Sequence, residues 1–303
     1  MDVTALAQIA RSAGIEAPLT GSALLGDGVK SVVRRLDFDG HESLALKVYT
    51  AAGVIDREIA GYRSAGGRID ELPRVVAHSG SADSTPFGWM LMSLAAGERL
   101  DLTIGWMPRE ERLAVLSEIG GFLSRLHSIE SPSFAQLAGS TGGCATNVEY
   151  MRQRFADSIG RFVERGGDRE LADQIAKWFA AQEHRLSGCS QPVVCHGDVH
   201  LENIFIKPGP DPHVTTVIDL EVSQSADPVL DLAKTLHHLA WIGEHDVLPA
   251  LLAGYEDPPA WLDDALGVYI VFFDLKLWNF FAIDPQNTAT TSIAQRLAEA
   301  TGD

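Results

Sequence analysis

The sequence has few cysteines and no segment typical of secretion. Among 303 residues only three are cysteines, and Cys144, Cys189 and Cys195 lack metal-ligand spacing and cannot all pair. A disulfide framework is therefore not expected, and a reducing cytoplasm is the predicted environment. The N-terminus begins Met-Asp and lacks the basic region and apolar core of a signal peptide.

Long apolar runs are also missing. The one stretch long enough to suggest a membrane span, 265–283, is interrupted by Asp274, Lys276 and Asn279. Charged side chains are costly in lipid, so we expect a buried helix there. The hydrophobic share of 46% is typical of a globular protein with one large or two ordinary domains.

Positive charge is scarce. The chain has 24 Lys and Arg against 41 Asp and Glu, which gives a formal net charge of −17. A nucleic-acid backbone or an anionic membrane would be repelled, so we expect neither as a partner. The acidity is compatible with a cationic small molecule, and equally with an ordinary solvated surface.

The densest chemistry lies between Pro192 and Lys207, which spell P-V-V-C-H-G-D-V-H-L-E-N-I-F-I-K. Two short apolar runs bracket a polar loop, a pattern that predicts two strands. Asp198 precedes Asn203 by five positions, and a β-branched run from Val214 then ends in Asp219. A carboxylate to accept a hydroxyl proton, with an amide and a carboxylate to hold Mg²⁺, is what phosphoryl transfer needs.

Three motifs, H-G-D-x-x-x-x-N, I-D-x-E and D-P-x-x-D-L-A (Asp227 to Ala233), resemble the aminoglycoside phosphotransferase and choline kinase-like superfamily. The resemblance implies an α+β, bilobal protein-kinase-like fold. It implies that Asp198 is the catalytic base, that Asn203 and Asp219 hold Mg²⁺, and that His196 shapes the loop.

The motifs depart from those of protein kinases. Gly197 stands where protein kinases have Arg, and Leu220 and Glu221 replace the Phe and Gly of D-F-G. We therefore do not expect a protein kinase controlled by activation-loop phosphorylation.

The N-terminal part carries a candidate nucleotide site. Gly26 and Gly28 fit a kinase glycine-rich loop, with Ser31 at the third glycine position. A Walker motif is excluded, because Asp27-Gly28 stands where Lys-Ser/Thr is required. Asp39-Gly40 predicts a hairpin that places Lys47 on a strand. Glu58, in a predicted helix at 54–64, is then positioned to pair with Lys47, which holds nucleotide phosphates in kinases.

Further strands at 72–78 and 88–92, joined by a turn at 83–86, complete a predicted five-stranded antiparallel sheet. The next segment resembles the one that links the two lobes and offers backbone groups to adenine. We expect the lobes to be 1–95 and 96–303, with a hinge near 93–97. The residues expected beside the nucleotide base are Met92, Ser93, Leu94 and Ala95.

The remainder is predicted to be mainly helical. Helical periodicity marks 3–13, 108–129, 149–165, 169–187, 232–243, 247–255, 261–283 and 292–300. Candidate acceptor contacts are Glu202, Glu221, Asp227, Asp231, Glu149 and Tyr150. Structural caps are the alternative for Asp227 and Asp231, and exposed helix positions for Glu149 and Tyr150.

Together these features predict an ATP- or GTP-dependent, Mg²⁺-requiring O-phosphotransferase. The expected acceptor is a cationic small molecule, namely an antibiotic such as an aminoglycoside or a tuberactinomycin peptide, and no obligate protein partner is evident. Alternatives are a metabolic kinase of a choline- or sugar-type alcohol, or an inactive kinase-like binding module. The D-x-H order at Asp198 also begins metallophosphoesterase motifs, but the chain contains no Gly-Asn dipeptide for their later G-N-H segment.

Overall fold

The computed structural model describes residues 2–80, 85, 87–138, 142–209, 211–284 and 286–302, so most of the turn predicted at 83–86 lies outside the described residues. The chain divides into two compact units. The first comprises Met1–Glu118, Leu137–Gly139 and Leu201–Ser223, and the second comprises Ile119–Gln136, Ser140–His200 and Gln224–Asp303. The predicted lobe boundary after Ala95 stays a prediction.

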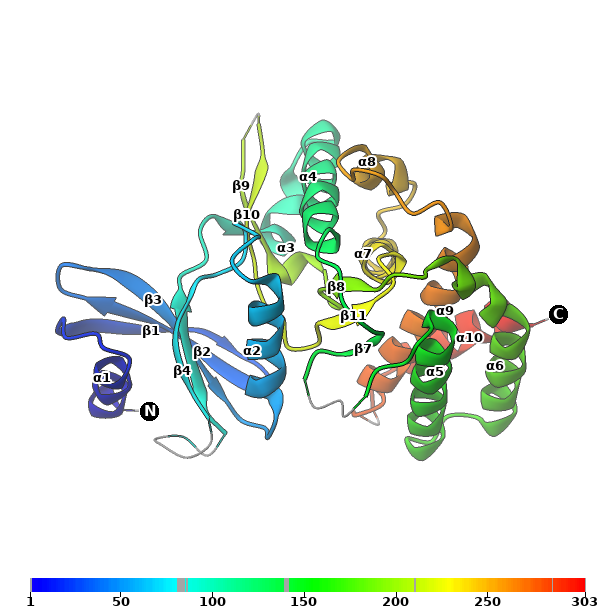
Figure 1. Cartoon of the computed structure of the whole chain (residues 1–303), viewed down its shortest axis with the longest axis horizontal. Coiled ribbons are helices and arrows are strands. Elements are labelled where there is room, and N and C mark those ends of the chain that lie inside the picture. Colours follow the sequence, from blue (N-terminus) through cyan, green and yellow to red (C-terminus); the bar gives the residue numbers. More distant parts are fainter. Residues whose placement is uncertain are drawn as a thin grey trace. The chain divides into compact units, whose positions relative to one another are not determined.

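The first unit is built on a five-stranded antiparallel sheet, as the sequence predicts (Figure 1). Its strands, in spatial order, are β1 (Leu19–Asp27), β2 (Ser31–Phe38), β3 (His41–Tyr49), β5 (Trp89–Ser93) and β4 (Val75–Ser79). The predicted Asp39-Gly40 turn joins β2 to β3, and Gly40 has φ +65°, a conformation that favours glycine.

The alternation of side chains along β3 builds a layer on each face of this sheet. Leu44 and Leu46 join the apolar cluster that holds α1 (Val3–Ser12). Ala45 and Tyr49 point to the opposite face and join the cluster that holds α2 (Val54–Ala65). Figure 1 shows the two helices on opposite sides of the sheet. Lys47 shares the parity of Ala45 and Tyr49, so its side chain faces α2.

A second, smaller sheet of the first unit carries the segments that hold Asn203 and Asp219. The hairpin β9 (Ile204–Lys207) and β10 (His213–Val217) pairs with β6 (Glu98–Arg99), and α3 (Leu100–Thr103), η1 (Ile104–Trp106) and η3 (Leu201–Asn203) adjoin in sequence. Gly97 precedes β6 with φ +87°, and a Cβ there would lie 2.4 Å from the carbonyl oxygen of Ile206. Only glycine allows the chain to pass this hairpin so closely.

The second unit is mainly helical. Helix α4 (Arg109–His127) starts in the first unit, and the second unit continues with α5 (Asn147–Glu164), α6 (Arg169–Gln182), η2 (Glu183–Gly188), α7 (Val229–Trp241), α8 (Leu248–Ala253), α9 (Leu262–Phe281) and α10 (Ala289–Thr301). The predicted helices are present with shifted ends. The one expected at 169–187 changes to a 3-10 helix after Gln182, and the one expected from 232 already starts at Val229.

Helix α9 lies in the interior of the second unit and packs against α5, α7 and α10. Phe155 of α5 stacks on Phe179 of α6, with ring centroids 4.0 Å apart, and contacts Phe272 of α9 at 5.2 Å. Within the described part of the chain, no helix is long and apolar enough to cross a membrane. A small sheet of β7 (Ala135–Gln136), β11 (Gln224–Ala226) and β8 (Val193–Cys195) completes the unit.

Candidate active site

A cavity of about 440 Å³ in the first unit gathers the predicted nucleotide and metal residues. This volume is within the usual range of small-molecule sites. The predicted residues among its lining are Gly26, Gly28, Ser31, Lys47, Glu58, Met92, Ser93, Leu94, Ala95, Asn203 and Asp219. They come from the β1–β2 connection, β3, α2, the end of β5 and the β9–β10 region. Segments that are far apart in the sequence therefore line one cavity.

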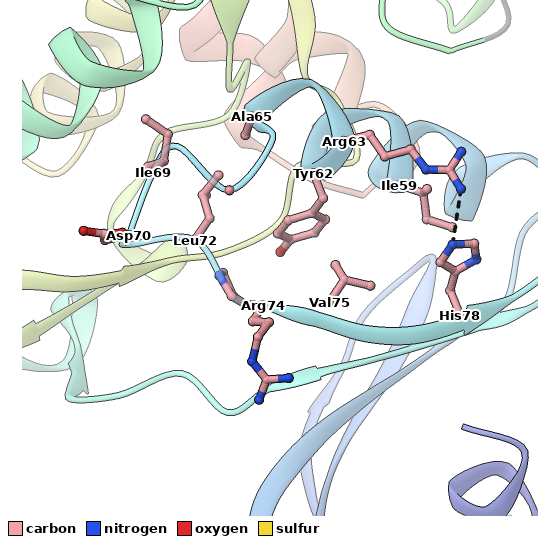
Figure 2. A pocket seen from close by; sticks show the side chains of 12 residues that line it. Ile59, Tyr62, Arg63, Ala65, Ile69, Asp70, Leu72, Arg74, Val75 and His78 are labelled. Carbon is pink, nitrogen blue, oxygen red and sulfur yellow. Dashed lines mark hydrogen bonds between the residues drawn. The ribbon is translucent and has the colours of Figure 1, made fainter. Parts of the chain in front are cut away.

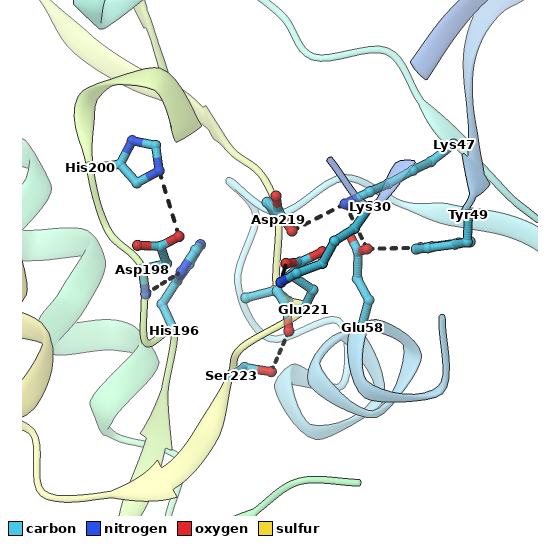
Figure 3. Close-up of polar contacts among 11 residues, drawn as sticks. Lys30, Lys47, Tyr49, Glu58, His196, Asp198, His200, Asp219, Glu221 and Ser223 are labelled. Atoms are coloured by element: carbon cyan, nitrogen blue, oxygen red, sulfur yellow. Dashed lines mark hydrogen bonds and ion pairs between the residues drawn. The ribbon is translucent and has the colours of Figure 1, made fainter. Parts of the chain in front are cut away.

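Lys47 is the central cation of this cavity. Its Nζ lies 2.7 Å from Oε2 of Glu58 and 3.1 Å from Oδ1 of Asp219, so the predicted Lys47–Glu58 pair is confirmed (Figure 3). The Tyr49 hydroxyl donates to the same Glu58 oxygen at 2.8 Å. Burial alone would lower the pKa of Lys47, but the charges of Glu58 and Asp219 hold that pKa above its usual value. Lys47 thus stays an ammonium group, as phosphate binding requires.

Three carboxylates of the first unit lie close together near Lys47. Glu58, Asp219 and Glu221 each offer a carboxylate oxygen, and these atoms lie within 4.8 Å of one another. The Asn203 carbonyl accepts a hydrogen bond from the Ile218 amide at 2.9 Å, which fixes Asn203 beside the segment that leads to Asp219. An all-oxygen donor set fits Mg²⁺. Asp219 has φ +72°, a left-handed conformation that is costly for a non-glycine residue and that clusters at functional sites, although Asp246 and Asp257 share it elsewhere in the chain.

The glycine-rich connection is fixed by its own backbone. The Gly28 amide donates to the Ser31 carbonyl at 2.9 Å, and the Thr50 amide donates to the Lys30 carbonyl at 2.8 Å. A Cβ at Gly26 would meet no atom within 4 Å, so there is open space beside this backbone, as a ligand cradle requires. Lys30 pairs with Glu221 at 2.5 Å. Lys30 is not among the predicted site residues, although its place within the glycine-rich motif was a usable signal.

The loop that carries Asp198 belongs to the second unit, where helix α7 sets its shape. Asp231, fully buried on α7, accepts hydrogen bonds from the amides of His196 and Gly197, each at 2.7 Å. His127 Nε2 lies 3.1 Å from the same carboxylate. Within the loop, Nδ1 of His196 accepts the Asp198 amide at 3.3 Å, which supports the predicted loop-shaping role of His196 (Figure 3).

The Asp198 side chain itself sits between cationic and polar neighbours. Lys234 Nζ lies 2.8 Å from Oδ1, and His200 Nε2 lies 3.6 Å from Oδ2. Burial acts to raise the pKa of Asp198, but the His200 hydrogen bond and the Lys234 charge outweigh it and hold that pKa well below its usual range. Asp198 is therefore ionised at neutral pH. Lys234 is also absent from the predicted site residues, because no sequence motif marks a lysine within a helix as part of a site.

Two of the predicted acceptor contacts are interior groups. Asp227 and Asp231 are both 0% exposed. Asp227 accepts hydrogen bonds from the Val229 amide, Trp261 Nε1, the Tyr269 hydroxyl and Asn147 Nδ2, at 3.0 to 3.1 Å. A buried carboxylate with this many partners cannot reach an acceptor. The structural alternative therefore describes both aspartates better than the acceptor prediction.

The other acceptor candidates are placed differently. Glu149 caps α5 through a reciprocal capping box with Thr146. Tyr150 is 5% exposed and donates its hydroxyl to Gln224 Oε1 at 2.6 Å. Glu221 is engaged by Lys30, whereas Glu202 is exposed and lines the cavity of the first unit.

A second cavity, of about 480 Å³, lies between α2 and β4 within the first unit (Figure 2). It has apolar walls such as Ile59 and Leu72, and Arg63 Nη2 lies 3.4 Å from Nε2 of His78 at its edge. Tyr62 and Pro73 line both cavities. None of the predicted site residues lines this second cavity, so it adds nothing to the candidate active site.

Residues 24–265 match the model of a family described as the phosphotransferase enzyme family, APH. No curated protein matches the chain.

Several solved structures share the fold. A thermostable mutant of aminoglycoside phosphotransferase APH(4)-Ia, in ternary complex with ADP and hygromycin B, has a TM-score of 0.73 at 16% identity over 97% of both chains. The GDP and kanamycin complex of APH(2″)-IIia has a TM-score of 0.71 at 14% identity over 97% of both chains. A putative fructosamine-3-kinase from Thermobifida fusca YX-ER1 has a TM-score of 0.71 at 18% identity, again over 97% of both. The TM-scores show a common fold, and at identities this low the comparison shows the fold alone.

Proposed function

Because the chain belongs to the phosphotransferase enzyme family, we propose that it transfers the γ-phosphoryl group of ATP or GTP to a hydroxyl of a cationic small molecule, with antibiotics of the aminoglycoside or tuberactinomycin type as the first candidates. The family shows that the enzyme is a small-molecule kinase. Its nucleotide, its metal and its acceptor are what we propose here. One observation carries the nucleotide and the metal: a single cavity gathers the glycine-rich loop, Lys47 and the two predicted metal ligands.

In the proposed nucleotide site, residues 1–95 form the nucleotide-binding lobe with a hinge near 93–97. Lys47, held by Glu58, contacts the phosphates, while Asn203 and Asp219 hold Mg²⁺. When bound, Mg²⁺ neutralises charge on the nucleotide phosphates. The carboxylate–lysine network keeps these groups ordered before the nucleotide arrives, so little ordering has to accompany binding.

Asp198 is the proposed base. Its carboxylate is ionised and able to accept the proton of an acceptor hydroxyl. The loop that bears it is fixed by backbone hydrogen bonds to Asp231, so its position does not depend on the acceptor. Cys144, Cys189 and Cys195 are free thiols, which supports a reducing cytoplasm as the site of the reaction.

The net charge of −17 supports a cationic acceptor, as does exposed Glu202 at the cavity. Kanamycin and hygromycin B, both present in complexes of the structural neighbours, are the natural first acceptors to test. The interior positions of Asp227 and Asp231 remove two acids from the acceptor side. This favours, as a second candidate, a metabolic kinase of a choline- or sugar-type alcohol.

The test is a consumption assay with ATP and GTP across kanamycin, hygromycin B, tuberactinomycin peptides, choline and sugar-type alcohols. Mass spectrometry then checks each product for an added phosphate. Asp198→Asn should lower turnover about 10²- to 10⁴-fold while nucleotide binding persists. Asp173→Asn, at an exposed position of α6, is the matched control and should keep full turnover. Near-normal turnover of Asp198→Asn would contradict the proposed base, and a wild-type enzyme that phosphorylates no acceptor would contradict the proposed reaction.

A further inference from the structure

Helix α7 presents two residues to the loop of Asp198 from one face. Asp231 and Lys234 are three positions apart, which places them on the same side of a helix. Asp231 accepts the loop amides of His196 and Gly197. Lys234 reaches the side chain that this loop presents, with Nζ 2.8 Å from Oδ1 of Asp198. The helix thus fixes the loop backbone through one residue and contacts the proposed base through the other.

Lys234 is held in place on its other side. Its ammonium lies over the ring of Phe273 on α9, 5.8 Å from the centroid, and its side chain is only 19% exposed. A lysine confined in this way loses much of the rotamer freedom that weakens surface ion pairs. The contact with Asp198 is therefore a defined geometric constraint.

The two oxygens of Asp198 have different surroundings. Oδ1 is bound by Lys234, whereas Oδ2 faces His200 Nε2 at the longer distance of 3.6 Å. An ion pair at one oxygen fixes the rotation of the whole carboxylate.

We propose that Lys234 is a positioning residue for phosphoryl transfer, which holds Oδ1 of Asp198 and so orients the carboxylate toward the acceptor hydroxyl. The inference rests on the proposed function, because it takes Asp198 to be the base. It adds a residue that no sequence motif marks.

The charges around Asp198 within the second unit determine what removal of Lys234 would do. Helix α7 contributes Asp231, Lys234 and His238, and the loop contributes His196 and His200. Lys276 of α9 lies over the Phe273 ring that Lys234 also contacts. Burial, with His200 and Lys234 as further causes, lowers the pKa of His238 to about 4, so His238 is neutral at neutral pH. Loss of Lys234 would remove a positive charge 2.8 Å from Oδ1, so the pKa of Asp198 would rise, with His200 as the remaining group that lowers it.

The decisive experiment is direct titration of Asp198 by NMR of side-chain ¹³C-labelled aspartate, with Asp198→Asn identifying its signal. It compares wild type, Lys234→Met, Lys234→Arg and the control Lys177→Met, which alters an exposed lysine of α6. We expect Lys234→Met to raise the proton affinity of Asp198 by about 10- to 1,000-fold, the usual effect of losing a close opposite charge. Lys234→Arg should restore the wild-type pKa of Asp198, and Lys177→Met should leave that pKa unchanged. An unchanged titration in Lys234→Met would overturn the proposal; Lys234→Gln replaces Met if that variant fails to fold.

A kinetic measurement separates this inference from the proposed function. With kanamycin, hygromycin B or choline, whichever accepts phosphate, Lys234→Met should lower kcat and shift the acid limb of the pH profile upward, with little change in acceptor KM. Lys234→Arg should recover most of the rate. A wild-type enzyme inactive with every acceptor would contradict the proposed function, while the titration would still decide whether Lys234 acts on the Asp198 carboxylate.

Discussion

Two lysines of the first unit, Lys47 and Lys30, form ion pairs with carboxylates near the proposed nucleotide site, and they differ in burial. The Lys47 side chain is 7% exposed and that of its partner Glu58 is 1% exposed. The Lys30 side chain is 44% exposed in its pair with Glu221. Solvent weakens the second pair, whereas loss of one partner from the first leaves a charge buried alone.

Removal of Lys47 should therefore lower the stability of the protein more than removal of Lys30. We expect Lys47→Met to lower the free energy of unfolding by about 3–5 kcal/mol, because Glu58 would stay buried without its cation. Lys30→Met should cost about 1 kcal/mol or less. Urea unfolding of the two variants measures both values, and equal losses would show that burial does not govern these pairs.

The metal assignment is testable at the same scale. Asn203→Ala and Asp219→Ala should each raise the Mg²⁺ concentration needed for half-maximal activity, because each removes one oxygen ligand. Asp211→Ala, in the β9–β10 connection, is exposed and serves as the control. A Mg²⁺ titration that is unchanged in Asp219→Ala would show that Asp219 is not a ligand.

Side chains whose roles follow from spacing could be predicted, whereas those whose roles depend on burial could not. The Asp198–Asn203 interval and the strand position of Lys47 are local patterns. Asp227 and Asp231 look like any acids near a site until the structure shows them 0% exposed. Lys234 lies on a helix far along the chain from Asp198, and only the packing of α7 brings them together.

At the scale of elements, the length of a helix or strand largely determined whether it could be predicted from the sequence. The longer helices and the strands of the five-stranded sheet carry enough periodic residues to be predicted. Strands β6 and β7 have two residues each, which is too few to form a pattern, and β11 (Gln224–Ala226) lacks the apolar run that marks the equally short β8. Their pairing partners, not their own residues, make them strands.

Helical glycines give an element-scale prediction with a built-in control. A Cβ at Gly120 of α4 would lie 1.8 Å from the Leu251 carbonyl oxygen of α8, whereas one at Gly160 of α5 would meet no atom within 4 Å. Gly120→Ala should destabilise the protein by about 1–3 kcal/mol through overpacking. Gly160→Ala should stabilise it by about 0.5–1 kcal/mol, because alanine favours the helix. Thermal unfolding should thus shift in opposite directions, and a stabilised Gly120→Ala would contradict the α4–α8 contact.

At the scale of the whole molecule, the net charge of −17 creates a field that extends well beyond any single contact. This field attracts cations and repels anions during diffusional encounter, and dissolved salt weakens it. At an ionic strength of about 0.01 M the screening length is about 30 Å, and at about 0.15 M it falls to about 8 Å. Attraction over distances comparable to the size of the enzyme is therefore lost between these two conditions.

If the acceptor is a polycation, kcat/KM should fall steeply between these salt concentrations, with most of the change in KM. An uncharged sugar-type alcohol should react at a rate nearly indifferent to salt, since the field does not act on it. Nucleotide must be saturating in both series, because MgATP is itself charged and would add its own salt dependence. The comparison also controls for general salt effects on the enzyme, which both acceptors share. A best acceptor that is uncharged, with a salt-independent rate, would exclude the cationic antibiotic and leave the metabolic kinase as the function of this chain.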